Sequence, residues 1–326
     1  MKVIAWCVMF LPSLLWAQGE AVSAPHQSSS AAANSTSETE ETYRPEEPQA
    51  PESIEKRARD AKGLFAQRAI REAATVDNPF VLTPHKPTYF LPISYSNSME
   101  DETFLGDKAD TESLDNLEFT FQVSLKFPLA YGIVGRNTSL WVGYTQRSYW
   151  QAYNSNISSP FRDTNYEPEV FISTKPKWDL FGVKPEYVIY GFVHQSNGQS
   201  GELSRSWNRV YADILFEKGN TAFSIKPWYR LPESKEIDDN PNIERYYGYG
   251  EFSMIHIIGD YSIDAMIRNN LRLSGNKGSL QLGFNFPLWG RSRGYVQYFN
   301  GYGQSLLDYD HHTQSVGLGI MLTNWL

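Results

Sequence analysis

The sequence is almost free of cysteine: Cys7 is the only one among 326 residues. Cys7 lies in an N-terminal segment that we expect to be removed, so the mature chain would have no disulfide and no thiol chemistry. A basic excess is also lacking, because the formal net charge at pH 7 is −8. An acidic chain of this kind gives no support to nucleic-acid binding, and we expect no nucleic-acid partner.

Long apolar runs are scarce too. Residues 1–17 combine Lys2, an apolar stretch from Val3 to Trp16, and Ala17 at a plausible cleavage point. These are the features of a secretory signal peptide. The alternative is a transmembrane anchor, but the apolar run is too short to cross a bilayer. The rest of the sequence contains no apolar helix of spanning length, which excludes a bundle of membrane helices.

Large apolar side chains are nearly missing from residues 18 to about 50, which are rich in Ser, Ala, Thr, Glu and Pro. Such a segment buries too little surface to fold, so we predict disorder. Residues 52–74 have a helix-forming composition with a thin apolar stripe, and they fit either a short amphipathic helix or a charged linker, of which we favour the linker. We therefore predict a signal peptide (1–17), a low-complexity, largely disordered extension (18–77) and one folded domain (78–326).

The folded domain is dominated by alternation of apolar and polar residues. From Leu117 to Leu129, every second residue is apolar and those between are mostly polar, as in Glu118 and Lys126. A run of this length is long for a soluble strand. It suits a tilted strand that crosses a bilayer, with one face toward lipid and the other toward a lumen.

The same alternation recurs along the chain. Candidate strands lie near 87–97, 114–129, 138–151, 166–176, 182–196, 207–217, 220–231, 244–258, 260–271, 277–288, 291–302 and 313–325. Twenty Tyr and nine Trp residues could supply interfacial aromatic girdles. The pattern predicts an all-β fold, a transmembrane antiparallel β-barrel of about 12 strands in the outer membrane of a Gram-negative bacterium. The alternative, a secreted β-sandwich, would have apolar faces too long to cover in water.

One predicted hairpin, residues 190–211, carries the candidate catalytic residues. Period 2 places His194 and Ser196 on one face of its first strand. If the loop is symmetric about Gly201, His194 lies opposite Asn208, within reach of a hydrogen bond. A hydroxyl nucleophile, a base and a group that orients the base form the triad used in acyl transfer. A polar loop without catalytic function is the alternative.

The location of this hairpin indicates a substrate. Asn208 shares its strand face with Val210, Ala212, Ile214 and Phe216, so the three polar residues lie on the apolar side. In outer-membrane barrels the longer loops face outward and the short turns face the periplasm. We therefore expect His194, Ser196 and Asn208 on the outer wall at the level of the outer leaflet, where the available substrate is membrane phospholipid.

Three segments resemble a known family. HQSNGQSGELSRSWNRVY at 194–211, SSPFRDTNYEPE at 158–169 and GYGQSLLDYD at 301–310 are similar to outer-membrane phospholipase A. The resemblance extends from about residue 78 to the C-terminus. It implies a twelve-stranded barrel with a calcium-dependent Ser-His-Asn site on its outer surface, active as a homodimer and monomeric at rest.

The resemblance also implies roles for individual residues. It makes Ser196 the nucleophile, His194 the base and Asn208 the orienting residue. The backbone N–H of Gly198 would belong to the oxyanion hole. The implied calcium ligands are the Ser204 hydroxyl, the Gln199 carbonyl and Ser158 of the other protomer. Gln146, whose position in the alternation faces lipid, would contact the other protomer.

Two functions follow from these observations. The first is a calcium-dependent phospholipase that hydrolyses acyl esters (A1/A2 and lysophospholipase type). The second is a passive outer-membrane pore or structural barrel without catalysis. The expected lumen charges Glu118, Lys126, Arg209 and Asp213 favour a lumen filled by hydrogen-bonded side chains, which speaks against the pore.

Overall fold

The computed structural model describes residues 51–76, 83–179, 182–290 and 292–326. The predicted signal peptide and the predicted disorder of residues 18–50 lie outside these residues. Two helices, α1 (Pro51–Asp60) and α2 (Leu64–Val76), precede the strands. None of the helices in the described ranges is both long enough and apolar enough to cross a bilayer.

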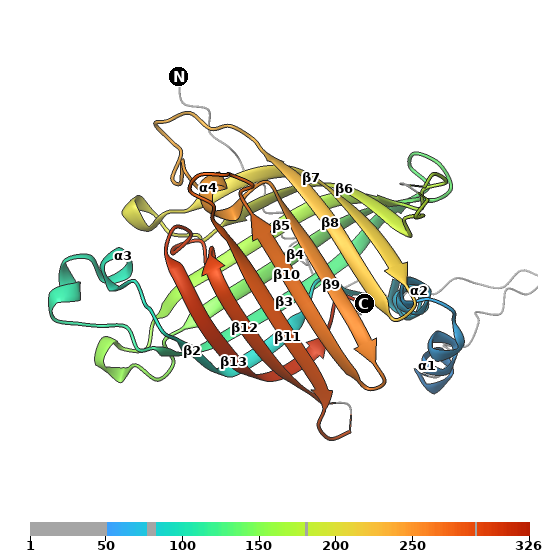
Figure 1. Cartoon of the computed structure of the whole chain (residues 1–326), viewed down its shortest axis with the longest axis horizontal. Coiled ribbons are helices and arrows are strands. Elements are labelled where there is room, and N and C mark those ends of the chain that lie inside the picture. The colour runs from blue at the N-terminus through green and yellow to red at the C-terminus, as the bar shows by residue number, and fades with distance from the viewer. Residues whose placement is uncertain (1–50, 77–82, 180–181, 291) are drawn as a thin grey trace, which may run out of the picture. The chain divides into compact units, whose positions relative to one another are not determined.

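A ring of strands follows the helices (Figure 1). Its members are β2 (Thr88–Ser96), β3 (Leu117–Tyr131), β4 (Thr138–Trp150), β5 (Phe161–Thr174), β6 (Tyr187–Ser196), β7 (Ser206–Lys218), β8 (Thr221–Arg230), β9 (Gly250–Ile258), β10 (Tyr261–Asn269), β11 (Gly278–Pro287), β12 (Arg293–Tyr302) and β13 (His312–Thr323). Each strand pairs antiparallel with its neighbour in sequence, and β13 pairs with β2 to close the ring. A two-residue strand, β1 (Thr83–Pro84), pairs with β3. The predicted all-β barrel of about 12 strands is confirmed.

Three predicted strand starts differ from the structure by five residues or more. Residues 244–247 form a helical turn, α4 (Glu244–Tyr247), where the sequence predicts the start of a strand. Gly248 follows it with φ 73°, and a Cβ there would lie 2.1 Å from the Asn269 carbonyl oxygen, so this turn requires glycine. β6 begins only at Tyr187, just after Pro185, which has no N–H for the ladder. β5 begins at Phe161, five residues before its predicted start.

The two faces of the barrel wall differ as predicted. Outer-face residues such as Phe192, Val210 and Leu318 are exposed on the single chain. Lumen-facing residues such as Glu118 and Lys126 are buried. An exposed apolar wall around a polar interior is the arrangement of a membrane-spanning barrel.

The lumen is filled with paired polar side chains. Arg162 Nε lies 2.7 Å from Glu118 Oε1, and Arg162 also pairs with Asp308. Arg209 lies 3.2 Å from Glu167, and Ser224 donates to Asp213 at 2.6 Å. A cavity of about 410 Å³ remains in the lumen, and Glu167, Arg209 and Asp213 are among the residues that line it. These ion pairs and hydrogen bonds fill the barrel axis, as predicted, and disfavour an open pore.

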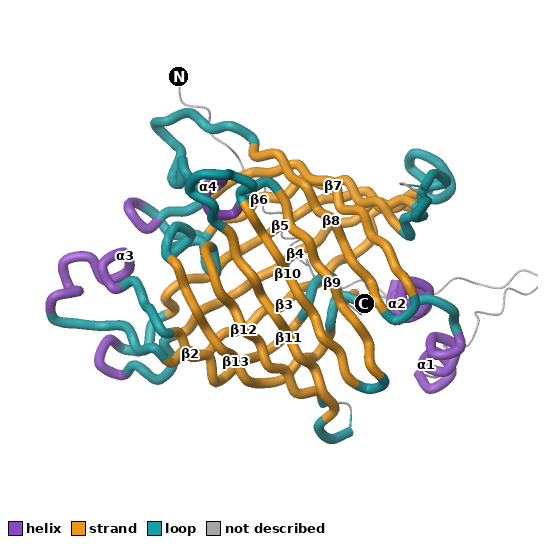
Figure 2. The backbone as a smooth tube through the Cα atoms, viewed as in Figure 1, coloured by secondary structure: helices purple, strands orange, loops and turns teal. Residues whose placement is uncertain are grey.

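Loops at the two ends of the barrel differ in length (Figure 2). At one end, residues 219–220 and 259–260 form two-residue turns. The opposite end has the longer connections, among them residues 97–116, 151–160, 197–205 and 231–249. The predicted catalytic loop, 197–205, therefore lies with the long loops, which face outward in such barrels.

Helix α2 packs at the end with the short turns, so the charged-linker interpretation of residues 52–74 is wrong. Phe65 is buried against Leu215, Ala222 and Ile255, and Glu217 accepts its backbone N–H at 2.9 Å. The thin apolar stripe is enough to hold the helix against the barrel, because the Phe65 side chain enters an apolar site formed by three strands.

An ion pair also fastens α2 to the wall: Glu72 lies 2.7 Å from Lys126 and 2.7 Å from Arg68. Burial alone would raise the pKa of Glu72, yet Arg68 and Lys126 lower it to about 2. A carboxyl with a depressed pKa stabilises the folded state above its unfolded pKa and loses that contribution as the pH falls. The contribution of Glu72 is therefore complete at neutral pH and declines only as the pH falls from about 4.5 toward 2.

Phe65→Ala is expected to detach α2 while the barrel stays closed. Truncation of a buried Phe to Ala lowers the stabilising free energy by about 3–5 kcal/mol, and α2 has few other buried apolar contacts. Amide hydrogen exchange in Leu64–Val76 should accelerate strongly, with exchange in β3–β13 unchanged. Lys62→Ala, an exposed neighbour, is the control. Unchanged protection of α2 in Phe65→Ala would contradict this account.

Candidate active site

Strands β6 and β7 bring the predicted catalytic residues together. Their register pairs His194 with Asn208 and Ser196 with Ser206, as predicted from a loop centred on Gly201. His194 Nδ1 lies 2.9 Å from Asn208 Oδ1. All three candidates, His194, Ser196 and Asn208, are partly exposed on the outer wall. They share it with the exposed side chains of Phe192 and Val210.

Ser196 lies at the end of β6, two residues beyond His194 and on the same face. Its register partner on the other side is Tyr166 of β5. Across the described residues, no hydrogen bond joins the Ser196 hydroxyl to the His194 ring. Catalytic hydrogen bonds are commonly long in the absence of substrate and tighten in the complex. The hairpin thus holds the predicted base and the predicted orienting residue in contact, with the predicted nucleophile two residues along β6.

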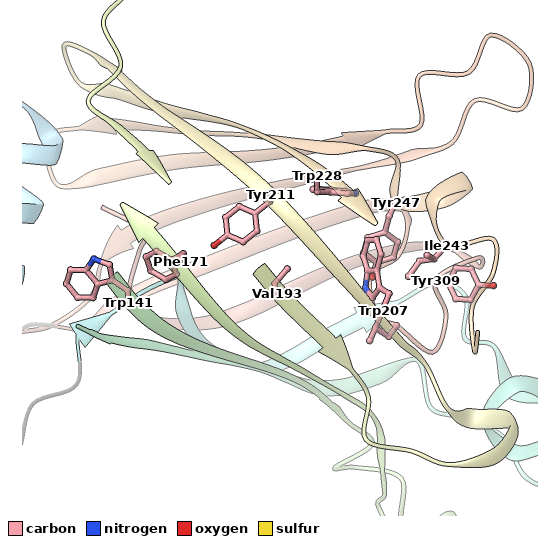
Figure 3. Packing of buried hydrophobic residues seen from close by; sticks show 10 residues of the cluster. Trp141, Phe171, Val193, Trp207, Tyr211, Trp228, Ile243, Tyr247 and Tyr309 are labelled. Atoms are coloured by element: carbon pink, nitrogen blue, oxygen red, sulfur yellow. The ribbon is translucent and has the colours of Figure 1, made fainter. Parts of the chain in front are cut away.

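The inward-facing residues of the same hairpin hold it in place. Trp207 is fully buried, and its Nε1–H donates to Gln195 Oε1 at 2.8 Å. The Arg209 guanidinium lies 3.9 Å from the centre of the Trp207 ring. Figure 3 shows Trp207 beside Tyr247, with Ile243 and Tyr309 close by. Because side chains alternate along a strand, locking Gln195, Trp207 and Arg209 inward fixes His194, Ser196 and Asn208 outward.

Asn197 organises the loop between the two strands. Its buried side chain accepts the N–H groups of Gln199 at 3.3 Å and Arg205 at 2.9 Å, and it donates to the Leu203 carbonyl at 2.8 Å. Sequence analysis missed this role. The sequence did contain a signal for this role, namely an Asn just before a Gly at the end of a strand. Asn side chains at such positions readily hydrogen-bond the backbone two residues further on.

Gly198, the predicted oxyanion donor, is exposed in the loop 197–205, two residues past the end of β6. Its φ is 66°, and a Cβ at this position would lie 3.0 Å from Tyr166 Cε2. Both observations favour glycine. Without a side chain, the exposed backbone of Gly198 stays uncovered.

The predicted metal ligands lie on two loops at the same end of the barrel. Ser204 and Gln199 belong to the loop 197–205, and the Ser204 hydroxyl donates to Asp239 Oδ2 at 2.7 Å. Ser158 is exposed on the loop 151–160, after the 3-10 turn η2 (Ser155–Ile157), with φ 64°. Hydroxyl, carbonyl and carboxylate oxygens are hard ligands of the kind that calcium takes. In the described part of the chain, no three His, Cys, Asp or Glu side chains converge as a metal site.

Two carboxylates at the site escaped sequence analysis. Asp239 bonds Ser204, and Glu233 Oε1 accepts a hydrogen bond from Asn208 Nδ2 at 2.9 Å. Both belong to the loop 231–249 between β8 and β9. No periodicity relates an irregular loop to a strand 25 or more residues away, so nothing in the sequence indicated these contacts.

Gln146 lies on β4, in register with Tyr166 of β5. It is partly exposed, accepts a hydrogen bond from Tyr144 Oη at 3.1 Å and donates to Ser148 Oγ at 3.1 Å. Alternation places these three side chains on the outer face of the wall. The predicted lipid-facing amide is therefore part of a short polar row on β4.

Comparison with known proteins gives consistent results. A family model described as phospholipase A1 matches residues 65–322. The phospholipase A1 of Escherichia coli (strain K12) is 38% identical over 248 residues, covering 76% of this chain and 83% of that protein. The putative phospholipase A1 of Neisseria meningitidis serogroup B is 37% identical over 251 residues, covering 74% of this chain and 65% of that protein.

Solved structures match as well. The outer membrane phospholipase A of Escherichia coli has a TM-score of 0.70 at 37% identity, covering 76% of this chain and 100% of that one. The outer membrane phospholipase of Salmonella typhi, a dimer with bound calcium, has a TM-score of 0.70 at 35% identity, covering 76% and 94%.

The closed barrel and these relatives confirm the predicted location in the outer membrane of a Gram-negative bacterium. The family match begins at residue 65, so it includes α2 as well as the barrel. Extent, identity and fold agree, and the chain belongs to the phospholipase A1 family.

Proposed function

We propose that this protein is a calcium-dependent phospholipase that hydrolyses acyl esters of phospholipids, of A1/A2 and lysophospholipase type, at a Ser-His-Asn site. One observation carries the proposal: the 2.9 Å contact between His194 and Asn208, next to Ser196, on the apolar outer wall. Because this wall faces the membrane, the Ser196 hydroxyl would meet lipid there, and the substrate would be a membrane lipid.

Each catalytic residue has a defined task. Asn208 Oδ1 accepts the Nδ1–H of His194, which leaves Nε2 to take the proton of the Ser196 hydroxyl. The Ser196 oxygen attacks the ester carbonyl, and His194 returns the proton to the leaving alcohol oxygen of the lysophospholipid. Water, deprotonated by His194, then hydrolyses the acyl-enzyme and releases the fatty acid.

A neutral third member suits the location of the site. An ionised Asp on a lipid-facing wall would carry a large desolvation cost, whereas an amide carries much less. Negative charge that develops on the carbonyl oxygen would be met by the Gly198 N–H. Ser204, the Gln199 carbonyl and Ser158 of a second copy would hold calcium, and the bound ion supplies positive charge near that oxygen.

The decisive test is fatty-acid release from mixed phospholipid–detergent micelles, measured with calcium and with an excess of chelator. We expect release with calcium and none with chelator. Planar-bilayer conductance measured on the same preparation separates the alternative class, since a passive pore would conduct and release no fatty acid. Release that is equal under both conditions would reject the calcium dependence, and no release under either would reject the function.

The active species is expected to be a homodimer, with the monomer at rest. Calcium takes six to eight oxygens, water among them, and the loop 197–205 contributes few, so the exposed Ser158 of a second copy would add a ligand and waters would fill the remaining positions. Gln146 supplies an amide for contact across the two outer walls. Ligands that bind the dimer more tightly drive association by linkage. Specific activity and the mass of the protein particle can be measured together over a series of protein concentrations in detergent. With calcium present, both should rise together as the protein concentration increases.

Two variants test whether Gln146 and Ser158 are the residues that support the dimer. The double variant Gln146→Ala, Ser158→Ala should dimerise more weakly and need more calcium. Ser155→Ala, an exposed serine of the same loop, should behave as wild type. Full activity in a preparation that stays monomeric during turnover would contradict the dimer proposal.

A further inference from the structure

The Asn208 side chain is held from both ends. Its Oδ1 lies 2.9 Å from His194 Nδ1, and its Nδ2 donates to Glu233 Oε1 at 2.9 Å. Glu233 comes from the loop 231–249 and is partly exposed. The three-residue site thus continues into a fourth residue that bears a formal charge.

The fourth residue determines which way the amide points. An ionised carboxylate can only accept hydrogen bonds, so the NH₂ of Asn208 must face Glu233. The amide oxygen must then face His194, and a ring nitrogen that meets an acceptor must carry its proton. The neutral imidazole therefore has Nδ1–H and an unprotonated Nε2, the tautomer that can take a proton from Ser196. If the Asn208 amide were rotated by about 180°, its NH₂ would face Nδ1 of His194, and the ring proton would have to sit on Nε2. Nε2 could then no longer accept the proton of Ser196.

The backbone brings Glu233 to this position. After β8 ends at Arg230, the Leu231 N–H donates to the carbonyl of Asn208 at 2.8 Å. Pro232 follows with its restricted φ. The chain is thereby anchored to Asn208 itself two residues before Glu233, so the carboxylate and the amide are held on neighbouring segments.

Two other carboxylates of this loop are engaged elsewhere. Asp238 pairs with Arg230 at 2.6 Å, and Asp239 accepts from Ser204. Glu233 is thus the carboxylate directed at the His194–Asn208 pair. It belongs to the loop 231–249 at the end of the barrel with the long loops, and it is partly exposed. A charge there costs little desolvation, and the polarised amide transmits part of its effect to the imidazolium that forms during catalysis.

We propose that Glu233 is a positioning residue for the esterase reaction: it fixes the Asn208 amide and, through it, the productive tautomer of His194. This inference rests on the proposed function. The site is a relay in which the neutral residue faces the membrane and its carboxylate partner faces water.

The test compares steady-state kinetics of Glu233→Ala, Glu233→Gln and wild type on mixed micelles with saturating calcium. Glu233→Ala should lower kcat by about tenfold, the effect of about 1.4 kcal/mol on a barrier, with KM unchanged. Glu233→Gln keeps an acceptor oxygen for the Asn208 NH₂ and should recover part of the loss. Glu236→Ala, an exposed glutamate of the same loop, should stay within about twofold of wild type, the scatter we allow for a surface change.

A second comparison separates positioning from loop stability. In an Asn208→Ala background, Glu233→Ala should have almost no further effect, because it acts through the amide that has been removed. Additive losses in the double variant, or a Glu233→Ala enzyme as fast as wild type, would overturn the proposal. If the wild-type protein itself releases no fatty acid, the proposed function fails instead, and the two failures are thereby distinguished.

Discussion

Ser196→Ala is expected to abolish phospholipid hydrolysis, with kcat lowered by about 10⁶-fold, the loss seen when the nucleophile of a serine hydrolase is removed. The barrel should remain folded, because Ser196 is on the outer wall and contributes nothing to the hydrogen-bonded lumen. Loss of Asn208 should be milder, since an orienting group contributes less than the attacking atom.

Fatty-acid release gives the rate, and heat-dependent electrophoretic mobility gives the folded fraction of the barrel. Ser200→Ala, an exposed serine of the loop 197–205, is the matched control and should retain full activity. A Ser196→Ala protein that retains more than a small fraction of the wild-type rate would remove Ser196 from the role of nucleophile.

Removal of calcium is expected to stop turnover without unfolding the protein. The barrel is held by its strand ladder and by lumen pairs such as Arg162 with Glu118, none of which involves the loop 197–205. A site built largely of hydroxyl and carbonyl oxygens should bind calcium weakly, at about 10⁻⁴–10⁻³ M. Activity should therefore saturate only at millimolar calcium and return when calcium is added back after chelation.

Ser204→Ala should shift the calcium titration without eliminating the reaction. Loss of one oxygen ligand should raise the calcium concentration for half-maximal activity by about tenfold, the effect of about 1.4 kcal/mol on binding. Ser200→Ala again provides the comparison, and circular dichroism under chelation tests that the strands persist. Equal activity in excess chelator and in millimolar calcium would show that the proposed oxyanion arrangement is wrong.

Much of this protein is encoded in local patterns. Alternation over residues such as 117–129 sets which face of a strand meets lipid, because side chains of a strand alternate strictly. Even the contact between His194 and Asn208 follows from a hairpin whose two strands are close in sequence and whose loop is symmetric about Gly201. Where a contact spans one turn, strand periodicity and loop length determine it.

Tertiary structure decided the contacts that cross the barrel or enter from irregular loops. Phe65 docks against β7, β8 and β9, and a helix is packed there although the thin apolar stripe led us to favour a charged linker. Glu233 reaches Asn208, and Asp239 reaches Ser204, from a loop whose path depends on Pro232 and on the Leu231–Asn208 backbone bond. Such loops have no repeating geometry, and the position of each residue depends on the closed ring of strands. The sequence therefore determined the wall and the hairpin that carries the candidate catalytic residues, whereas only the closed barrel placed a carboxylate next to Asn208.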